Sequence, residues 1–258
     1  MRKSLLSVIL AILLISGLLT IPTTTHAEGE FVAFRPINGT DMVSVYEKPS
    51  EKASIVGEFY GGFKTTVYGH KGEWTRIYCP GIGDAYVLNE LLIYDEARFS
   101  VPMKTPIMAV SPPSGEKSIP FYFFLPIDDN SEADFMLIED TPVQVYGYVG
   151  DWCYVQMGDD YGYLKPDHLK ETDFAPCNLQ DINPFAWGEM LETKYPIYFY
   201  RAPDNEYKGT EWTDSSVLGH HRIEILIEFD DWCLIYFNIH LRFMRKTDLT
   251  LHYYAPQP

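Results

Sequence analysis

The stretch GDWCYVQ at residues 150–156 decides how this chain is organised, because two close variants of it occur elsewhere in the sequence. GEWTRIY occupies residues 72–78 and DDWCLIY occupies residues 230–236. In each phrase a turn residue and an acidic residue precede a tryptophan that begins a short alternating segment. The three tryptophans are 78 and 80 residues apart. A phrase that recurs at a nearly constant period indicates a repeated structural unit.

The agreement between the three copies extends to both sides of the tryptophan. A β-branched residue stands seven positions before it, an aromatic–aliphatic pair follows it by 11 or 12 positions, and a leucine comes six positions after that aromatic residue. Upstream, each copy has a short alternating segment that ends in proline: VSVYEKP to Pro49, IMAVSPP to Pro113 and IYFYRAP to Pro203. The anchors are Val67, Tyr86-Val87 and Leu92; Val145, Tyr163-Leu164 and Leu169; Ile225, Phe243-Met244 and Leu249.

Each copy is typical of short β-strands separated by Gly, Asp, Asn and Pro turns. No sustained helical period occurs after the first 27 residues. Several short strands that close on one core are stable where a single hairpin would not be. The sequence therefore predicts an all-β fold of small, strongly bent barrels.

The first copy resembles the bacterial SH3-like domain (SH3b) over its whole length. The similarity rests on V-x-V-Y-x-x-P at residues 43–49, VGEFYG at residues 56–61 in the place of the family's V-x-G-x-F-x-x-G, V-Y-G-x-x-G-x-W at residues 67–74, A-Y-V at residues 85–87 and Leu91-Leu92. The second copy has 14 more residues between its proline and its tryptophan, in an acidic stretch. The third copy departs after its tryptophan, where IHLRFMRKTDL replaces the usual Gly-Tyr-Val.

The resemblance implies three tandem SH3-like β-barrels behind a leader. We expect a leader at residues 1–27, domain 1 at 28–96, domain 2 with its acidic insertion at 97–171, and a divergent domain 3 at 172–258. For function, the resemblance implies a non-catalytic protein that binds a cell-envelope component such as a peptidoglycan peptide. The alternative is a secreted adaptor that binds another protein. The segments between the copies are short and contain apolar residues, so we expect the units to contact one another.

The first 27 residues have the pattern of a secretory signal peptide. Arg2 and Lys3 precede an unbroken apolar run, Pro22 ends that run, and THA at residues 25–27 provides small residues for cleavage. An uncleaved membrane anchor is the alternative, since 17 apolar residues can just span a thin bilayer. The pattern favours export, so we expect a secreted or envelope-associated protein.

The remaining chain is strongly acidic, and this excludes several partners. The sequence has 36 acidic and 20 basic residues, and removal of Arg2 and Lys3 leaves 18 basic residues, a balance of −18. Nucleic-acid binding requires a basic surface. Anionic membranes would be repelled by the same charge. We therefore expect neither nucleic acid nor membrane as a partner after cleavage of the leader.

Strand alternation places the repeated tryptophans on the face opposite to the barrel core. One face of the phrase carries Cys153, Val155 and Met157, and the equivalent residues of the other copies are also mostly apolar. The tryptophans should therefore lie on the less buried side. They are interpreted either as packing residues, which we favour, or as a platform for a peptide or sugar. The candidate ligand-binding residues on these strands are Trp74, Tyr78, Trp152, Tyr154, Trp232 and Tyr236.

Two further tryptophans lie outside the repeat anchors. Trp187 follows the segment between the second and third copies, and Trp212 lies in the polar stretch GTEWTDSS. Exposed aromatic residues in loops are frequent binding residues, so both are candidates for ligand contact. Packing on their own unit is the alternative.

The four cysteines do not form a disulfide framework. Cys153 and Cys233 fall on the core face and are expected to be buried free thiols. Cys79 ends a strand and Cys177 lies in an intervening segment, so the sequence leaves the disulfide state of these two open.

No catalytic motif or cofactor motif is present, and we expect no enzymatic activity and no cofactor. His220-His221 lacks further ligands at metal-binding spacing, and a Cys177–His168 pair has no catalytic domain around it. A weak calcium candidate occurs in the acidic stretch, where a solvated loop is the alternative. Its residues are Asp128, Asn130, Glu132, Asp134 and Glu139.

Overall fold

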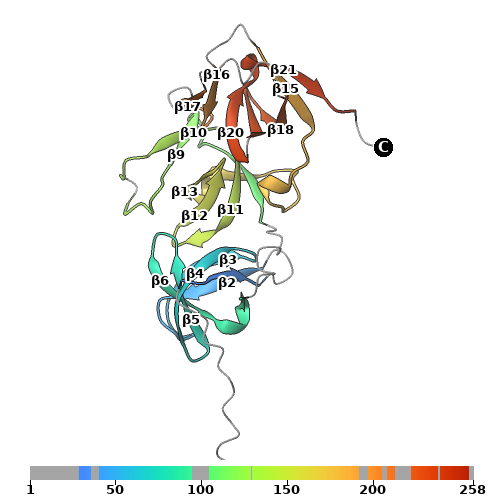
Figure 1. Cartoon of the computed structure of the whole chain (residues 1–258). Coiled ribbons are helices and arrows are strands. Elements are labelled where there is room, and N and C mark those ends of the chain that lie inside the picture. Colours follow the sequence, from blue (N-terminus) through green and yellow to red (C-terminus); the bar gives the residue numbers. More distant parts are fainter. Residues whose placement is uncertain are drawn as a thin grey trace, which may run out of the picture.

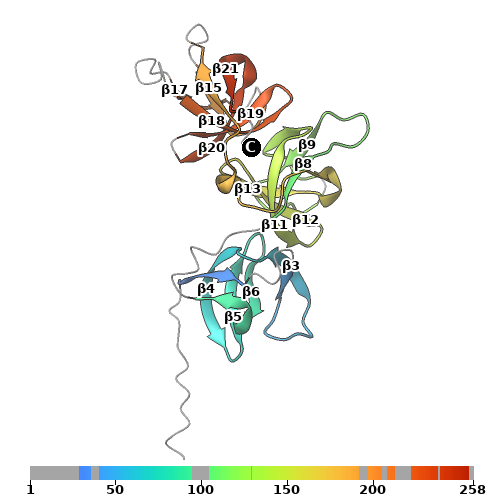
Figure 2. The same cartoon turned by 90° about the vertical axis from the view of Figure 1, so that its right-hand side faces the viewer.

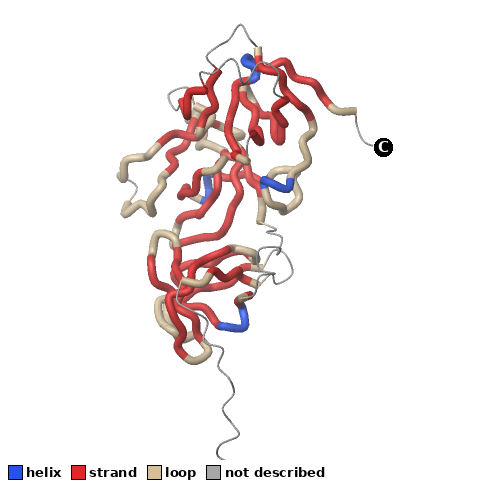
Figure 3. Tube along the Cα trace, in the orientation of Figure 1, coloured by secondary structure: helices blue, strands red, loops and turns tan. Residues whose placement is uncertain are grey.

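A computed structural model describes residues 29–35, 41–94, 105–128, 130–191, 197–204, 208–212, 222–237 and 239–255, with only the backbone for 208–212. The described chain is built of antiparallel strands with a few single turns of 3₁₀ helix (Figure 3). The all-β class predicted from the sequence is confirmed. The strands form three groups in sequence order, of which the first lies at one end of the molecule and the other two lie beside each other (Figures 1 and 2).

The first group, called unit 1, comprises β1 to β7. Alternating burial along β2, in which Val43 and Val45 are buried, is the pattern expected of a strand with one face on a core. The elements are β1 (Phe31–Phe34), β2 (Met42–Tyr46), β3 (Ile55–Tyr60), β4 (Lys64–Lys71), β5 (Trp74–Cys79), β6 (Gly83–Leu88), η1 (Asn89–Leu91) and β7 (Leu92–Ile93).

Units 2 and 3 comprise β8 to β14 and β15 to β21. Unit 2 has β8 (Ile107–Val110), β9 (Ser118–Phe121), β10 (Phe135–Ile138), β11 (Pro142–Val149), β12 (Trp152–Met157), β13 (Asp160–Leu164), η3 (Pro166–His168) and β14 (Leu169–Glu171), followed by η4 (Leu179–Asp181). Unit 3 has β15 (Ala186–Met190), β16 (Ile197–Tyr200), β17 (Lys208–Trp212), β18 (Arg222–Phe229), β19 (Trp232–Phe237), β20 (His240–Arg245), η6 (Lys246–Asp248) and β21 (Leu249–Tyr253).

The same order of neighbouring strands occurs in all three units. Unit 1 reads β3-β2-β6-β5-β4-β1-β7 and unit 3 reads β17-β16-β20-β19-β18-β15-β21. Unit 2 reads β13-β12-β11-β8-β14, and an isolated bridge between Tyr122 and Tyr163 brings the β9–β10 hairpin beside β13. The repeat seen in the sequence is therefore a repeat of strand topology.

The β-branched anchor seven residues before each tryptophan marks a β-bulge. The register shifts between Val67 and Gly69 in β4, and at the equivalent places in β11 and β18. A bulge bends a strand and increases its local twist, which helps a short sheet to curl around its core. All three anchors, Val67, Val145 and Ile225, are fully buried.

The strand order changes the alignment of the second copy. By sequence pattern, residues 107–113 of the second copy match residues 43–49 of the first. In the structure β8 instead pairs with β11 and β14, as β1 pairs with β4 and β7. The counterpart of β2 is β9, and Tyr122 bridges β13 as Tyr46 bridges β6. The expected 14-residue acidic insertion disappears, because these residues contain β9 and the β9–β10 connection.

Units 1 and 2 are joined by direct strand pairing. Gly147 and Tyr148 of β11 pair with Phe59 and Glu58 of β3, so that both units contribute to one sheet. Residues of unit 2, including Trp152, also belong to the same buried hydrophobic cluster as the core of unit 1. The expected contact between these units is confirmed.

Units 2 and 3 share a second continuous hydrophobic core. Phe121 and Met157 of unit 2 lie in one buried cluster with Trp232 and Phe243 of unit 3. At its edge the Asp159 carboxylate accepts hydrogen bonds from the Leu241 backbone N–H at 2.9 Å and from the His240 ring at 2.7 Å. The segment that follows β14 also packs on unit 2, since Leu179 is buried there and its N–H donates to Gln144 Oε1 at 3.1 Å.

The leader expected at residues 1–27 lies outside the described residues. Within the described part of the chain, no helix has the length and apolar character needed to cross a membrane.

Candidate binding groove

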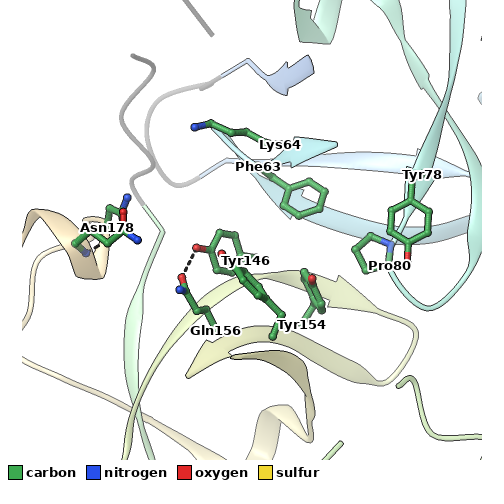
Figure 4. Close-up of a pocket in the computed structure, with 10 residues that line it drawn as sticks. Phe63, Lys64, Tyr78, Pro80, Tyr146, Tyr154, Gln156 and Asn178 are labelled. Atoms are coloured by element: carbon green, nitrogen blue, oxygen red, sulfur yellow. Dashed lines mark hydrogen bonds between the residues drawn. The ribbon is translucent and has the colours of Figure 1, made fainter. Parts of the chain in front are cut away.

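A groove of about 370 Å³ lies where units 1 and 2 meet, and half of its lining residues are aromatic. Unit 1 contributes residues that follow β3 and residues at the end of β5, and unit 2 contributes residues of β11, β12 and β13. Figure 4 shows Phe63 and Tyr78 on one side of the space and Tyr146 and Tyr154 on the other. The lining is Phe63, Lys64, Tyr78, Pro80, Tyr146, Tyr154, Gln156, Tyr161, Asn178 and Gln180.

A neighbouring hollow of about 500 Å³ extends this space along the junction. The two hollows share Tyr78, Pro80, Tyr154 and Tyr161 as lining residues, so we treat them together as the junction groove. The extension is lined by the β5–β6 turn at residues 80–83 and by residues 123–125 at the end of β9. A peptide or another extended chain has the shape that fits such a groove.

The aromatic rings of the groove form a connected set. Tyr154 lies at its centre, with its ring centroid 6.1 Å from that of Tyr161, 5.2 Å from Tyr163 and 6.2 Å from Phe63. Tyr154 and Tyr161 are stacked at 23°. Because these rings pack against one another, their side chains have less conformational freedom to lose when a ligand binds.

Two polar side chains of the groove are held by a hydrogen bond to each other. The buried Tyr146 hydroxyl donates to Gln156 Oε1 at 2.6 Å, as the dashed line in Figure 4 shows. Lys64 is the only residue with a charged side chain in the described lining of either hollow. Such a wall offers ring faces, phenolic hydroxyl groups and a single cation to a bound peptide.

Burial raises the pKa of four tyrosines that line the junction groove. The pKa of Tyr146 lies well above its usual value, first because of burial and second because of the neighbouring Tyr161. Burial is also the main cause of the raised pKa values of Tyr154, Tyr161 and Tyr163. These four groups therefore remain neutral hydrogen-bonding hydroxyls throughout the physiological range.

We expect alkaline pH to destabilise the junction. Unfolded tyrosines lose their protons near pH 10, whereas the buried ones hold theirs to higher pH. The stability that these groups contribute is therefore complete below about pH 10 and falls as pH rises towards their folded pKa values. A spectrophotometric titration at 295 nm should show several of the 19 tyrosines ionising only when circular dichroism reports unfolding. Ionisation of all of them near pH 10 in a folded protein would contradict this prediction.

Two of the three repeat tryptophans are packing residues. Trp152 is 8% exposed and Trp232 is 4% exposed, although strand alternation placed them on the less buried side. The tyrosine at the end of the β2 counterpart covers each indole edge-on, and a basic side chain covers its face. The interpretation favoured in the sequence analysis fits these two positions, and neither residue lines the junction groove.

The other candidate residues are divided between the groove and the rest of the surface. Tyr78, which is 43% exposed, and Tyr154 line the groove. Trp74 is half-buried and lies outside it, with its ring edge-on to Tyr46 at 5.4 Å. Tyr236 is half-buried on unit 3.

Trp187 and Trp212 belong to unit 3 and not to the groove. Trp187 lies in β15, stacked on His252 at 4.1 Å, with the Arg222 guanidinium 5.1 Å from its ring centroid. It therefore packs on its own unit. The backbone of Trp212 ends β17, and its side chain lies outside the described structure. His220-His221 also lies outside the described residues.

The weak calcium candidate is not assembled into a site. Asp128 accepts a hydrogen bond from the Asn130 N–H at 2.9 Å, and Asp134 accepts one from the Phe123 N–H at 2.7 Å. Glu139 instead pairs with Lys170 at 3.3 Å. In the described ranges, no three His, Cys, Asp or Glu side chains, Glu132 included, gather where they could hold a metal ion.

All four cysteines are free thiols. Burial raises the pKa of Cys79, Cys153 and Cys233 to about 12 in each case. The expected burial of Cys153 and Cys233 is confirmed. For Cys79 and Cys177, whose state the sequence left open, the structure shows no disulfide.

Sequence reasoning missed most of the groove. It did not identify Phe63, Tyr146, Tyr161 or Tyr163 as site residues. Tyr146 is the extra residue at the β11 bulge, and a bulge often turns a side chain towards a site. The bulge could have been inferred from the Val145 anchor, but the partner surface on unit 1 could not.

Comparisons with known proteins leave the family open. No protein-family model matches the chain, and no curated protein matches it. The solved structures with some similarity include NlpC1 from Trichomonas vaginalis, with 11% identity, a TM-score of 0.28, and coverage of 92% of this chain and 97% of that chain. NlpC2 from the same organism has 9% identity, a TM-score of 0.27, and coverage of 88% and 97%. At such low TM-scores these similarities carry no argument about this chain.

Proposed function

We propose that this chain is an exported, non-catalytic binding protein built of three SH3-like repeats, and that it recognises a peptide of the cell envelope, such as a peptidoglycan peptide. The junction groove is the observation that carries this proposal. Two adjoining hollows form it, and packed aromatic rings from two units line it, as in binding sites for extended peptides.

The repeated strand order supports the SH3-like part of the proposal. Seven strands in the same order, with a bulge at the same place, are consistent with one small curled sheet repeated three times. In this arrangement the tyrosine-rich edge of unit 2 faces unit 1. Two units together therefore provide a longer binding surface than one unit alone.

The state of the cysteines supports a non-catalytic role. A thiol acts as a nucleophile only as thiolate, and a pKa of about 12 keeps Cys79, Cys153 and Cys233 protonated at neutral pH. Burial also raises the pKa of Cys177, although less strongly.

Co-sedimentation with purified peptidoglycan tests the proposal. The protein should be the chain from residue 28, which keeps every described strand, at low and at physiological salt. Aromatic recognition predicts binding that survives physiological salt, because ring contacts are not screened. The Tyr78→Ala change should weaken binding roughly tenfold, by removing an aromatic anchor worth about 1.4 kcal/mol.

Tyr236→Ala is a matched control for Tyr78→Ala. Both tyrosines stand four positions after their repeat tryptophan, but Tyr236 lies on unit 3 and away from the groove. We expect this variant to sediment like the unchanged protein. Absence of sedimentation at either salt concentration, or equal loss in both variants, would contradict the proposed envelope function of the groove.

A secreted protein–protein adaptor is the second candidate, and one feature favours it. Phe124 and Ile127, in the connection between β9 and β10, are 81% and 99% exposed, and the exposed Ile82 lies in the β5–β6 turn, whose residues line the groove together with Phe124. Exposed apolar side chains at a groove are typical of protein contact sites. This candidate predicts secreted proteins that are retained by the unchanged chain and lost with Phe124→Ser, with no binding to peptidoglycan.

A further inference from the structure

Each repeat tryptophan packs against an equivalent tyrosine, but among the described residues a basic side chain lies over the indole ring in only two of the three units. Each indole meets the tyrosine of its own β2 counterpart edge-on, so the packing beneath the three rings is equivalent. The pairs are Tyr46–Trp74 at 5.4 Å, Tyr122–Trp152 at 5.4 Å and Tyr200–Trp232 at 4.9 Å.

In units 2 and 3 the chain places its own cation over the indole face. Lys165 Nζ lies 4.0 Å from the ring centroid of Trp152, and the Arg245 guanidinium carbon lies 5.2 Å from that of Trp232. Both distances are within the range of cation–π attraction. The two basic residues occupy one repeat position, directly after the aromatic–aliphatic pair.

Unit 1 has Leu88 at this repeat position. Leu88 pairs with Trp74 across β5 and β6, as Arg245 pairs with Trp232 across β19 and β20. Lys71 faces Trp74 from β4, but it is exposed and makes no cation–π contact. No described cation lies over Trp74, which is half-buried, whereas the other two repeat tryptophans are buried.

Unit 1 keeps the acidic residue that precedes the repeat tryptophan, although it lacks the basic residue found in the other two units. Glu73 precedes Trp74, as Asp151 and Asp231 precede the other two tryptophans. Glu90 follows in η1. Glu73 and Glu90 are exposed, and neither forms an ion pair with another described residue. An aromatic ring with acidic residues at neighbouring positions of the chain, in a protein with a balance of −18, attracts cations.

We propose that unit 1 binds a lysine or arginine side chain of a partner peptide over the indole of Trp74, in the place that Lys165 and Arg245 occupy in the other units. The site is distinct from the junction groove, because Trp74 and Leu88 do not line that groove. It therefore does not depend on the proposed envelope function. The other units define its occupant as a basic side chain, because they contain one.

Titration followed by NMR tests this site directly. The probes are the capped peptide Gly-Lys-Gly and the same peptide with an acetylated lysine, which lacks the charge. The readout is the indole N–H signal of Trp74, assigned from its loss in Trp74→Phe. We expect the charged peptide to shift this signal, and binding of the acetylated peptide to be weaker by roughly fivefold, the effect of one exposed cation–π contact.

Two reciprocal variants distinguish the proposal from general attraction to an acidic protein. Leu88→Lys places a basic side chain over Trp74, as in the other units, and should abolish the shift. Lys165→Leu uncovers Trp152 and should produce a second responding indole signal. The proposal would be overturned if the charged peptide failed to shift Trp74, or if Leu88→Lys left the shift unchanged.

Discussion

The Gly147→Ala change is expected to lower the free energy of unfolding by about 3 kcal/mol, because no space exists for a side chain there. A Cβ atom on Gly147 would lie 2.3 Å from the Glu58 carbonyl oxygen and 2.8 Å from the Phe59 Cα. Both are backbone atoms of β3, which cannot move without breaking the pairing between β3 and β11. The added methyl group therefore forces units 1 and 2 apart.

Urea unfolding followed by tryptophan fluorescence would measure this loss. Gly188→Ala is a suitable control, since the three atoms nearest to a Cβ atom there are side-chain atoms of Leu249 at 3.0 to 3.4 Å, and these can shift. We expect it to cost less than about 1 kcal/mol. A larger radius of gyration for Gly147→Ala in X-ray scattering would report separation of the units. Equal stability of the two variants would contradict the tight β3–β11 contact.

The second large effect is expected for Trp232→Ala, which should lose about 3 to 5 kcal/mol. Trp232 is buried in the core shared by units 2 and 3, beneath Arg245 and against Tyr200. The change would leave a cavity at the junction of two units. It would also remove the indole ring against which the Arg245 side chain packs. Loss of secondary structure at a lower urea concentration, followed by circular dichroism, would measure it.

Trp74→Ala is the comparison for Trp232→Ala. Because Trp74 is half-buried and lies under no cation, we expect less than half of the destabilisation that Trp232→Ala causes. The difference tests whether the tryptophan of unit 1 is partly released from packing, as the cation-site proposal requires. Equal losses in the two variants would mean that all three tryptophans serve the fold alone.

The three repeat tryptophans show which structural features the repeat pattern predicts and which it does not. The pattern correctly located a strand, its turn and its core face in every copy. It did not predict burial of Trp152 and Trp232, because the cover on their outer face comes from residues outside the phrase. For Trp232 that cover is Tyr200, 32 positions earlier, and Arg245, 13 positions later.

The opening strand of the second copy shows a different limit. Residues 107–110 and 118–121 are both short apolar segments, and a proline follows each within a few positions. Strand propensity cannot distinguish them, because it describes a half-buried extended segment and not its partner. Only the pairing of β8 with β14, and the bridge from Tyr122 to Tyr163, assigned each segment to its place.

The sequence by itself determined the all-β class, the threefold repeat, the repeat anchors Val67, Val145 and Ile225, and the core face of each tryptophan strand. These features follow from the two-residue period of a strand and from turn residues, which are local properties of the chain. The tertiary structure alone decided the junction groove, because Tyr78 and Tyr154 meet only when β3 pairs with β11. That pairing depends on the fit of two surfaces far apart in the chain, and no local pattern encodes it.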